Sequence, residues 1–141
     1  MQDTGKPLPL TGNEASATQP RPGVALGITE SEIRRLVVAF YGEACEDAQI
    51  GPIFRRVVHD WDAHYDTLTD FWSAMVLGTK RYSGRPAASH MPLDLTRADY
   101  ERWSALWSAV AVRELGEVKA EPFVDMGTKM AQSMSRWLPR R

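Results

Sequence analysis

The strongest constraint on this chain is the spacing of its apolar residues, which recur at the three- and four-residue steps of an α-helix. About four separate stretches show this spacing. Breaks rich in Gly and Pro divide them, at Gly51-Pro52, at residues 78–92 and at Gly116. No stretch shows the alternation of apolar and polar side chains that a half-buried strand needs. The sequence therefore predicts an all-α domain.

Two of the predicted helices begin with the same local signal. Thr29 is followed three residues later by Glu32, and Thr96 is followed three residues later by Asp99. In such a capping box, each side chain accepts a hydrogen bond from a backbone N–H group at the start of the helix. We therefore expect the first helix to begin at Thr29 and the third to begin at Thr96.

The remaining helix boundaries rest on weaker signals. Asp60 is a suitable N-cap for the second helix, which we expect to end near Gly78. Pro122 suits the first turn of the last helix. Ile53 and Phe54 follow a Gly-Pro pair, so a short turn is predicted there.

Residues 1–27 differ from the rest of the chain in composition. They contain several Pro, Gly, Ser and Thr residues and show no apolar period. We expect an unstructured N-terminal extension, although a segment that docks on a partner has the same composition. Residues 28–141 would then form the folded domain.

The composition excludes several classes of protein. The 141 residues are 43% hydrophobic and 25% charged, which suffices for one domain with a core, and the net charge of −1 favours neither nucleic acid nor an anionic membrane. Cys45 is the only cysteine, so an intrachain disulfide and zinc sites built on paired cysteines are excluded. No apolar run suits a signal peptide or approaches the about 20 residues of a membrane span. A cytoplasmic protein is expected.

One histidine lies in an irregular segment between aromatic-rich helices. His90 is preceded by a helix that carries Phe71 and Trp72 and is followed by a helix that carries Trp103 and Trp107. A loop imidazole between apolar walls is what an iron porphyrin requires, because the iron takes one nitrogen ligand and the flat ring needs apolar cover. A histidine on the surface of a loop is the alternative.

Three residues on apolar helix faces can donate a hydrogen bond, namely Tyr41, His64 and Trp103. Each could be an ordinary core residue. Together they would suit a polar diatomic ligand in an apolar pocket. A zinc site built on His59, His64 and a carboxylate is a weaker alternative, because a five-residue separation places the two imidazoles poorly on one helix face.

Taken in order, the motifs resemble a truncated haemoglobin of the third group. The resemblance covers about residues 30–137, and no motif is distinctive without the others. The motifs are Phe40-Tyr41, Ile50-Gly51-Pro52-Ile53-Phe54, Trp61-Asp62-Ala63-His64, Phe71-Trp72, Tyr82-Ser83-Gly84-Arg85-Pro86, His90 and Tyr100-Glu101-Arg102-Trp103.

The resemblance implies a shortened globin fold, a two-over-two helical sandwich around haem b. His90 would be the proximal iron ligand, and Tyr41, His64 and Trp103 would be the donors of the distal pocket. Lys80, Arg81 and Arg85 could pair with the haem propionates, to which Tyr82 would add a hydrogen bond. The other implied haem contacts are Phe54, Leu68, Phe71 and Trp72.

The expected function is to bind O2, NO or CO. Three donors favour slow release of O2 over bulk transport, and hence redox or detoxifying chemistry such as NO dioxygenation or peroxidase-like turnover. An external reductase would be needed, since no flavin or nicotinamide motif is found. Two alternatives stay open, a gas or redox sensor that contacts a partner through residues 1–27 and a helical interaction domain without haem. Within the haem interpretation, His64 could ligate the iron in the resting state.

Overall fold

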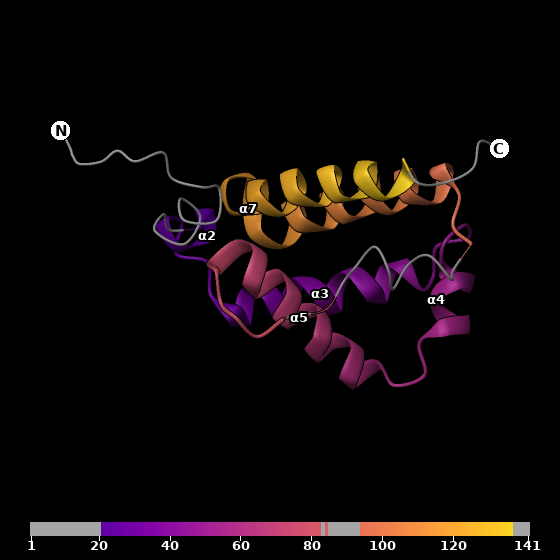
Figure 1. The fold of residues 1–141 in the computed structure, drawn as a ribbon, viewed down its shortest axis with the longest axis horizontal. Helices are drawn as coiled ribbons and strands as arrows, with labels where there is room; N and C mark the ends of the chain where they lie inside the picture. Colours follow the sequence, from indigo (N-terminus) through magenta and orange to yellow (C-terminus); the bar gives the residue numbers. More distant parts are fainter. Residues whose placement is uncertain (1–20, 83, 85–93, 137–141) are drawn as a thin grey trace.

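The structure, a computed structural model, describes residues 21–82, 84 and 94–136, and every regular element among them is a helix. The predicted all-α class is confirmed. The helices are α2 (Pro22–Ala25), α3 (Glu30–Ala44), α4 (Gly51–Val57), α5 (Trp61–Leu77) and α7 (Arg97–Ser135), shown in Figure 1.

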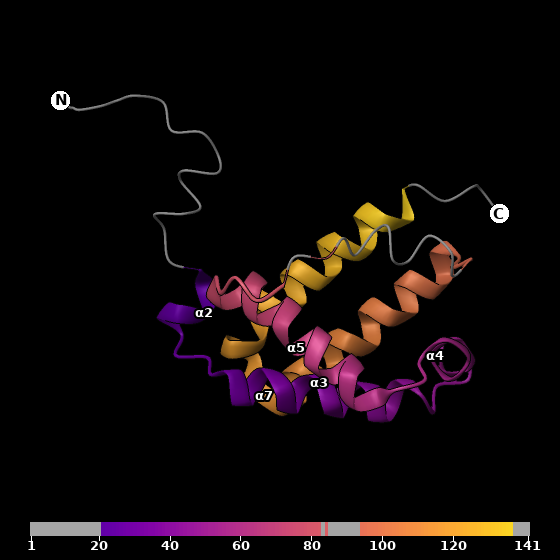
Figure 2. The same ribbon diagram turned by 60° about the horizontal axis from the view of Figure 1, so that its bottom comes forward.

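Helix α7 consists of two arms that fold back on each other at Gly116. This residue has φ 81° and ψ 163°, which interrupts the helical backbone. The indole N–H of Trp107 in the first arm donates to the carbonyl of Phe123 in the second arm, over 3.0 Å. The arms lie above α3 and α5 in Figure 1 and diverge from the bend in Figure 2. Two helices therefore cover two others, which confirms the predicted two-over-two arrangement.

The predicted helix starts are also confirmed. Complete capping boxes are present at Thr29 with Glu32 and at Thr96 with Asp99. The Asp60 side chain accepts a hydrogen bond from the backbone N–H of Ala63, so it caps α5 as expected. These signals succeed because each cap depends on residues within one helical turn.

Helix α3 lies at the centre of the core. Its residues Ile33, Leu36, Val37 and Phe40 are fully buried, and α3 packs against both α5 and α7. Burial of large apolar side chains of this kind contributes about 1.5–3 kcal/mol each, which makes this face the main source of stability.

The predicted boundary of the unstructured extension is wrong for residues 22–27. Helix α2 lies in this segment and packs on α5. A Cβ atom on Gly23 would lie 2.3 Å from Cγ1 of Val76, so only glycine permits this close approach. Ile28 is buried directly after the segment. Four residues of helix show no recognisable period in the sequence, which is why the segment was missed.

Two other boundaries need correction. Ile53 and Phe54 belong to α4 rather than to a turn, because Gly51-Pro52 begins a helix in which the missing N–H of proline costs no hydrogen bond. The last helical arm resumes directly after Gly116, so Pro122 lies inside the arm rather than in its first turn. None of the helices in the described ranges is long and apolar enough to cross a lipid bilayer.

The bend at Gly116 gives the first testable prediction. Gly116→Ala should lower the free energy of unfolding by about 1–3 kcal/mol, because this backbone conformation is essentially restricted to glycine. Gly42→Ala is the matched control, since Gly42 lies within α3 and an added Cβ there meets nothing within 4 Å. It should raise stability by about 0.5–1 kcal/mol. Urea unfolding followed by circular dichroism measures both, and equal effects would contradict the assignment of the bend.

Candidate functional site

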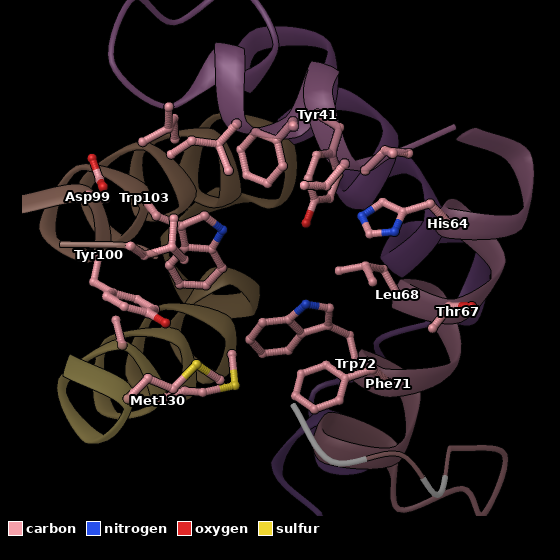
Figure 3. A pocket seen from close by; sticks show the side chains of 18 of the residues that line it. Tyr41, His64, Thr67, Leu68, Phe71, Trp72, Asp99, Tyr100, Trp103 and Met130 are labelled. Carbon is pink, nitrogen blue, oxygen red and sulfur yellow. The ribbon is translucent and has the colours of Figure 1, made fainter. Parts of the chain in front are cut away.

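A cavity of about 590 Å³ lies between α4, α5 and the two arms of α7, with Tyr41 of α3 on its wall. This volume falls within the range of small-molecule and cofactor sites. Figure 3 shows its side chains converging from both sides. Most of the residues that line it are apolar. Eight predicted site residues line it: Tyr41, Phe54, His64, Leu68, Phe71, Trp72, Tyr82 and Trp103. Lys80 and Arg81, which were predicted to pair with the haem propionates, do not line it.

The phenol of Tyr41 is a deeply buried polar group of the cavity. Tyr41 is 5% exposed, and its hydroxyl points into the cavity in Figure 3. Its ring packs edge-on against Phe40, Phe54 and His64, with centroids 4.9–5.1 Å apart. Burial raises the pKa of this phenol well above its usual range, so it stays protonated and can donate a hydrogen bond.

His64 and Trp103 face the cavity from opposite walls. His64 projects from α5 and Trp103 from the first arm of α7, and their ring nitrogens are directed toward the central space in Figure 3. An indole N–H can only donate, whereas an imidazole can donate or accept. The tertiary structure thus brings the three predicted donors together from three helices.

A fourth donor in the cavity was not predicted from the sequence. Trp72 was predicted only as an apolar wall, but its indole nitrogen also points into the cavity in Figure 3. The side chain is 1% exposed because it stacks on Trp107, with ring centroids 4.7 Å apart. Periodicity placed this residue on the buried face of α5 and could not show which edge of the indole faces the cavity.

The second arm of α7 also supplies residues to the cavity wall that the sequence indicated only as core residues. Met130 and Met134 line the cavity, as does Tyr100 on the first arm. The four-residue spacing of the two methionines was recognised as one helix face. No local signal indicates that this face borders a cavity, because that depends on how the arms pack.

Two predicted site residues, His90 and Arg85, lie outside the described residues. The described positions on either side of their segment, Tyr82 and Leu95, both line the cavity. Of the nearby basic residues, Arg81 forms an ion pair with Glu30 in the first turn of α3. That ion pair gives Arg81 a structural partner away from the cavity.

His59 was interpreted as a surface residue. It is exposed, yet it also borders the cavity. Among residues 21–82, 84 and 94–136, no group of three or more His, Cys, Asp or Glu side chains is arranged to hold a metal ion. A metal ion in this cavity would therefore need ligands other than a group of three such side chains from the described residues.

A polar network joins the turn before α4 to the start of α7 at the edge of the cavity. The Asp47 carboxylate accepts from the backbone N–H groups of Gln49 and Ile50, both over 3.0 Å, and from Nε of Arg102 over 2.8 Å. The Gln49 amide then donates to Asp99, also over 3.0 Å. Ile50 and Asp99 both line the cavity, so this network sets the separation of two of its walls.

Both carboxylates of the network are held in the charged form. The hydrogen bond from Arg102, aided by the backbone groups, lowers the pKa of Asp47. Burial acts to raise the pKa of Asp99, but hydrogen bonds from Thr96 and Gln49 outweigh it and leave that pKa below its usual value. The cavity therefore combines apolar walls, several N–H and O–H donors and the carboxylates of Asp60 and Asp99.

This arrangement suits a flat apolar group that carries a small polar ligand. The aromatic walls would cover the group, and the donors would stabilise negative charge on the ligand.

Comparisons with known proteins agree with the fold. Residues 25–136 match the family model of bacterial-like globins. A solved structure of a group III truncated hemoglobin from Campylobacter jejuni is similar, with a TM-score of 0.74 and 24% sequence identity, over 80% of this chain and 93% of that one. No curated protein sequence matches the chain.

The Asp47 network gives a prediction for stability and its pH dependence. Asp47→Asn should cost about 0.5–1.5 kcal/mol near neutral pH, because exposed and part-buried hydrogen bonds to a charged group are lost. The pKa of Asp47 is lowered by folding, so its contribution is present above the unfolded pKa of about 4 and is lost as pH falls through the folded value. Urea unfolding at a series of pH values measures this difference.

The matched control is Asp66→Asn, which removes an exposed ion pair with Arg34. Its effect should be smaller, because water and salt screen such pairs. If the difference in free energy of unfolding between wild type and Asp47→Asn stayed constant as the pH fell below the pKa of Asp47, the assignment would be contradicted.

Proposed function

Because the chain belongs to the bacterial-like globin family, whose members bind haem and diatomic ligands, we propose that its cavity holds haem b and a small gas ligand. The observation that carries the proposal is the convergence of the Tyr41, His64 and Trp103 donors inside an otherwise apolar cavity. A purely structural core would not favour several polar groups directed at one space, since each loses its hydration on burial.

The cavity residues fit a porphyrin. Phe54, Leu68, Phe71 and Trp72 supply apolar surface from α4 and α5, and the methionines of α7 supply the opposite wall. The volume of about 590 Å³ suits a cofactor of this class. Tyr82 at one edge is in position to donate to an anionic substituent of the ring.

His90 is our proposed iron ligand. Connectivity supports it, because Tyr82 and Leu95 both lie on the cavity wall and the chain between them carries this histidine. A neutral imidazole whose other nitrogen is hydrogen-bonded is a common iron ligand in globins. Arg85 of the same segment is proposed to pair with a propionate.

The bound haem would supply iron that holds the diatomic ligand and exchanges electrons with it. The chain's own residues would set how the ligand is held. Tyr41 keeps its proton and donates from α3, His64 donates from α5, and Trp103 donates from α7. Several donors around one small polar ligand slow its release.

Slow release is unsuited to bulk O2 transport, so the proposed role is redox or detoxifying chemistry, with NO dioxygenation and peroxidase-like turnover as the candidate reactions. Turnover requires electrons, and we propose an external reductase as their source. The proposed ligands are O2, NO and CO.

Visible absorption of the purified chain tests the haem proposal. Wild type should show a strong Soret band, and His90→Ala should weaken or shift it because the iron loses its nitrogen ligand. His59→Ala is the control and should leave the band unchanged. The ferrous spectrum also shows whether His64 occupies the sixth coordination position. A wild-type protein with no Soret band after haem is added would contradict the proposal.

Stopped-flow kinetics of the O2 complex test the donors. Tyr41→Phe should speed O2 dissociation about 2- to 12-fold, which corresponds to the about 0.5–1.5 kcal/mol of one hydrogen bond. The control is Tyr65→Phe. Tyr65 does not line the cavity, so this variant should leave the rate of O2 dissociation unchanged. Mixing the O2 complex with NO should yield nitrate; its absence would reject dioxygenation while leaving ligand binding intact.

A further inference from the structure

A series of aromatic rings leads away from the cavity along α3 and α5. The ring centroid of Trp61 lies 5.5 Å from that of Tyr41, and the centroid of Tyr65 lies 5.7 Å from that of Trp61. Tyr41 and Tyr65 are themselves 6.5 Å apart. All three rings are tilted relative to one another rather than perpendicular, so their π systems face each other in part.

The series begins at the cavity and ends at solvent. Tyr41 is buried and lines the cavity, with its hydroxyl directed inward in Figure 3. Trp61 and Tyr65 are partly exposed and do not belong to the cavity wall. The two outer rings therefore extend from the buried cavity wall to the surface, and Trp61 also packs edge-on against His64 of that wall, with centroids 5.5 Å apart.

We propose that Trp61 and Tyr65 form a one-electron relay through which oxidising equivalents leave the cavity and reach a small reductant at the surface. The proposal rests on the haem binding proposed above. The class of reductant is a phenol or an enediol such as ascorbate, because these compounds give up one hydrogen atom to an oxidised tyrosine.

The three rings have different parts in the relay because they differ in proton chemistry. Oxidation of a phenol requires loss of its proton, and burial raises the pKa of Tyr41, so this ring serves as a bridge. An oxidised indole can keep its N–H as a cation radical. Trp61 lies in sequence between the carboxylates Asp60 and Asp62, whose negative charge favours such a cation.

Tyr65 is suited to end the relay. Burial raises the pKa of this phenol as it does that of Tyr41, but Tyr65 is partly exposed, so its hydroxyl can pass a proton to water when the ring is oxidised. The charged groups that act on this phenol are Asp62 on its own helix and Arg34 on α3, with the Cys45 thiol nearby at the end of α3. Asp62 would attract the released proton, and Arg34, paired with Asp66, limits the net negative charge.

The electron balance requires a named oxidant, and we assign a hydroperoxide. Its reduction breaks the O–O bond and consumes two electrons and two protons to give an alcohol and water. Each electron passes inward from Trp61, and Tyr65 then gives one electron to Trp61 and one proton to water. Each reductant molecule returns a hydrogen atom to Tyr65, so two molecules balance one hydroperoxide.

A second stack of rings does not offer such a route. Trp103 stacks on Trp107 with centroids 5.7 Å apart, and Trp107 stacks on Trp72. Trp103 and Trp72 both line the cavity, and Trp107 between them is 1% exposed. This stack starts and finishes at residues of the cavity wall, whereas the series through Trp61 ends at a partly exposed ring outside that wall.

The test uses the full-length haem-loaded protein mixed with hydrogen peroxide and a nitroso spin trap. Freeze-quench electron paramagnetic resonance detects the protein radical, and peptide mass spectrometry locates the trapped adduct. Wild type should carry the adduct on Tyr65. Trp61→Phe should lower the yield of this adduct although Tyr65 is still present, because the phenylalanine ring is not oxidised and only the direct 6.5 Å step between Tyr41 and Tyr65 remains. Trp61→Tyr restores a redox-active ring and should recover the adduct.

Cys45→Ser is the matched control, since it removes an oxidisable side chain that lies outside both the series and the cavity wall. It should leave the Tyr65 adduct unchanged. An adduct on Tyr65 that is insensitive to Trp61→Phe, or adducts on Cys45 or Tyr100 without one on Tyr65, would overturn the relay. Soret absorption is recorded on every variant: a wild type without the band rejects the haem proposal, whereas a normal band with no Tyr65 adduct rejects the relay alone.

Discussion

The indole of Trp107 is the contact on which the arrangement of the helices depends. It stacks on Trp72 of α5 and packs edge-on against Phe40 of α3, with centroids 4.7 and 5.2 Å apart. Its N–H donates to the Phe123 carbonyl in the opposite arm of α7. A Cβ on Gly127 would lie 2.7 Å from this ring, so the second arm approaches it as closely as a glycine allows. One side chain thus joins both helix pairs.

This packing also determines the shape of the cavity. Trp72 and Trp103 are stacked on Trp107 on one side and form the cavity wall on the other. Their orientations are therefore set by the core, and close-packed aromatic rings have little freedom to collapse into the space between them. A cavity supported in this way can present donors at fixed positions before any ligand arrives.

Polar interactions perform a different task at the edge of the site. The Asp47 network links the turn before α4 with the start of α7, across 50 to 55 residues of sequence. Hydrogen bonds to charged groups of this kind specify geometry as well as adding stability.

The sequence by itself determined the helix starts at Thr29, Asp60 and Thr96 and the bend at Gly116, because caps and breaks depend on neighbours within one turn. It also identified the polar residues on buried helix faces through their spacing, and the resemblance supplied their expected roles. It missed α2, whose four residues show no period.

Only the tertiary structure decided that Tyr41, His64, Trp72 and Trp103 face one cavity, and that Gln49 reaches Asp99. Such contacts join residues that are far apart in the chain. Their geometry follows from the packing of whole helices, which local sequence patterns do not encode.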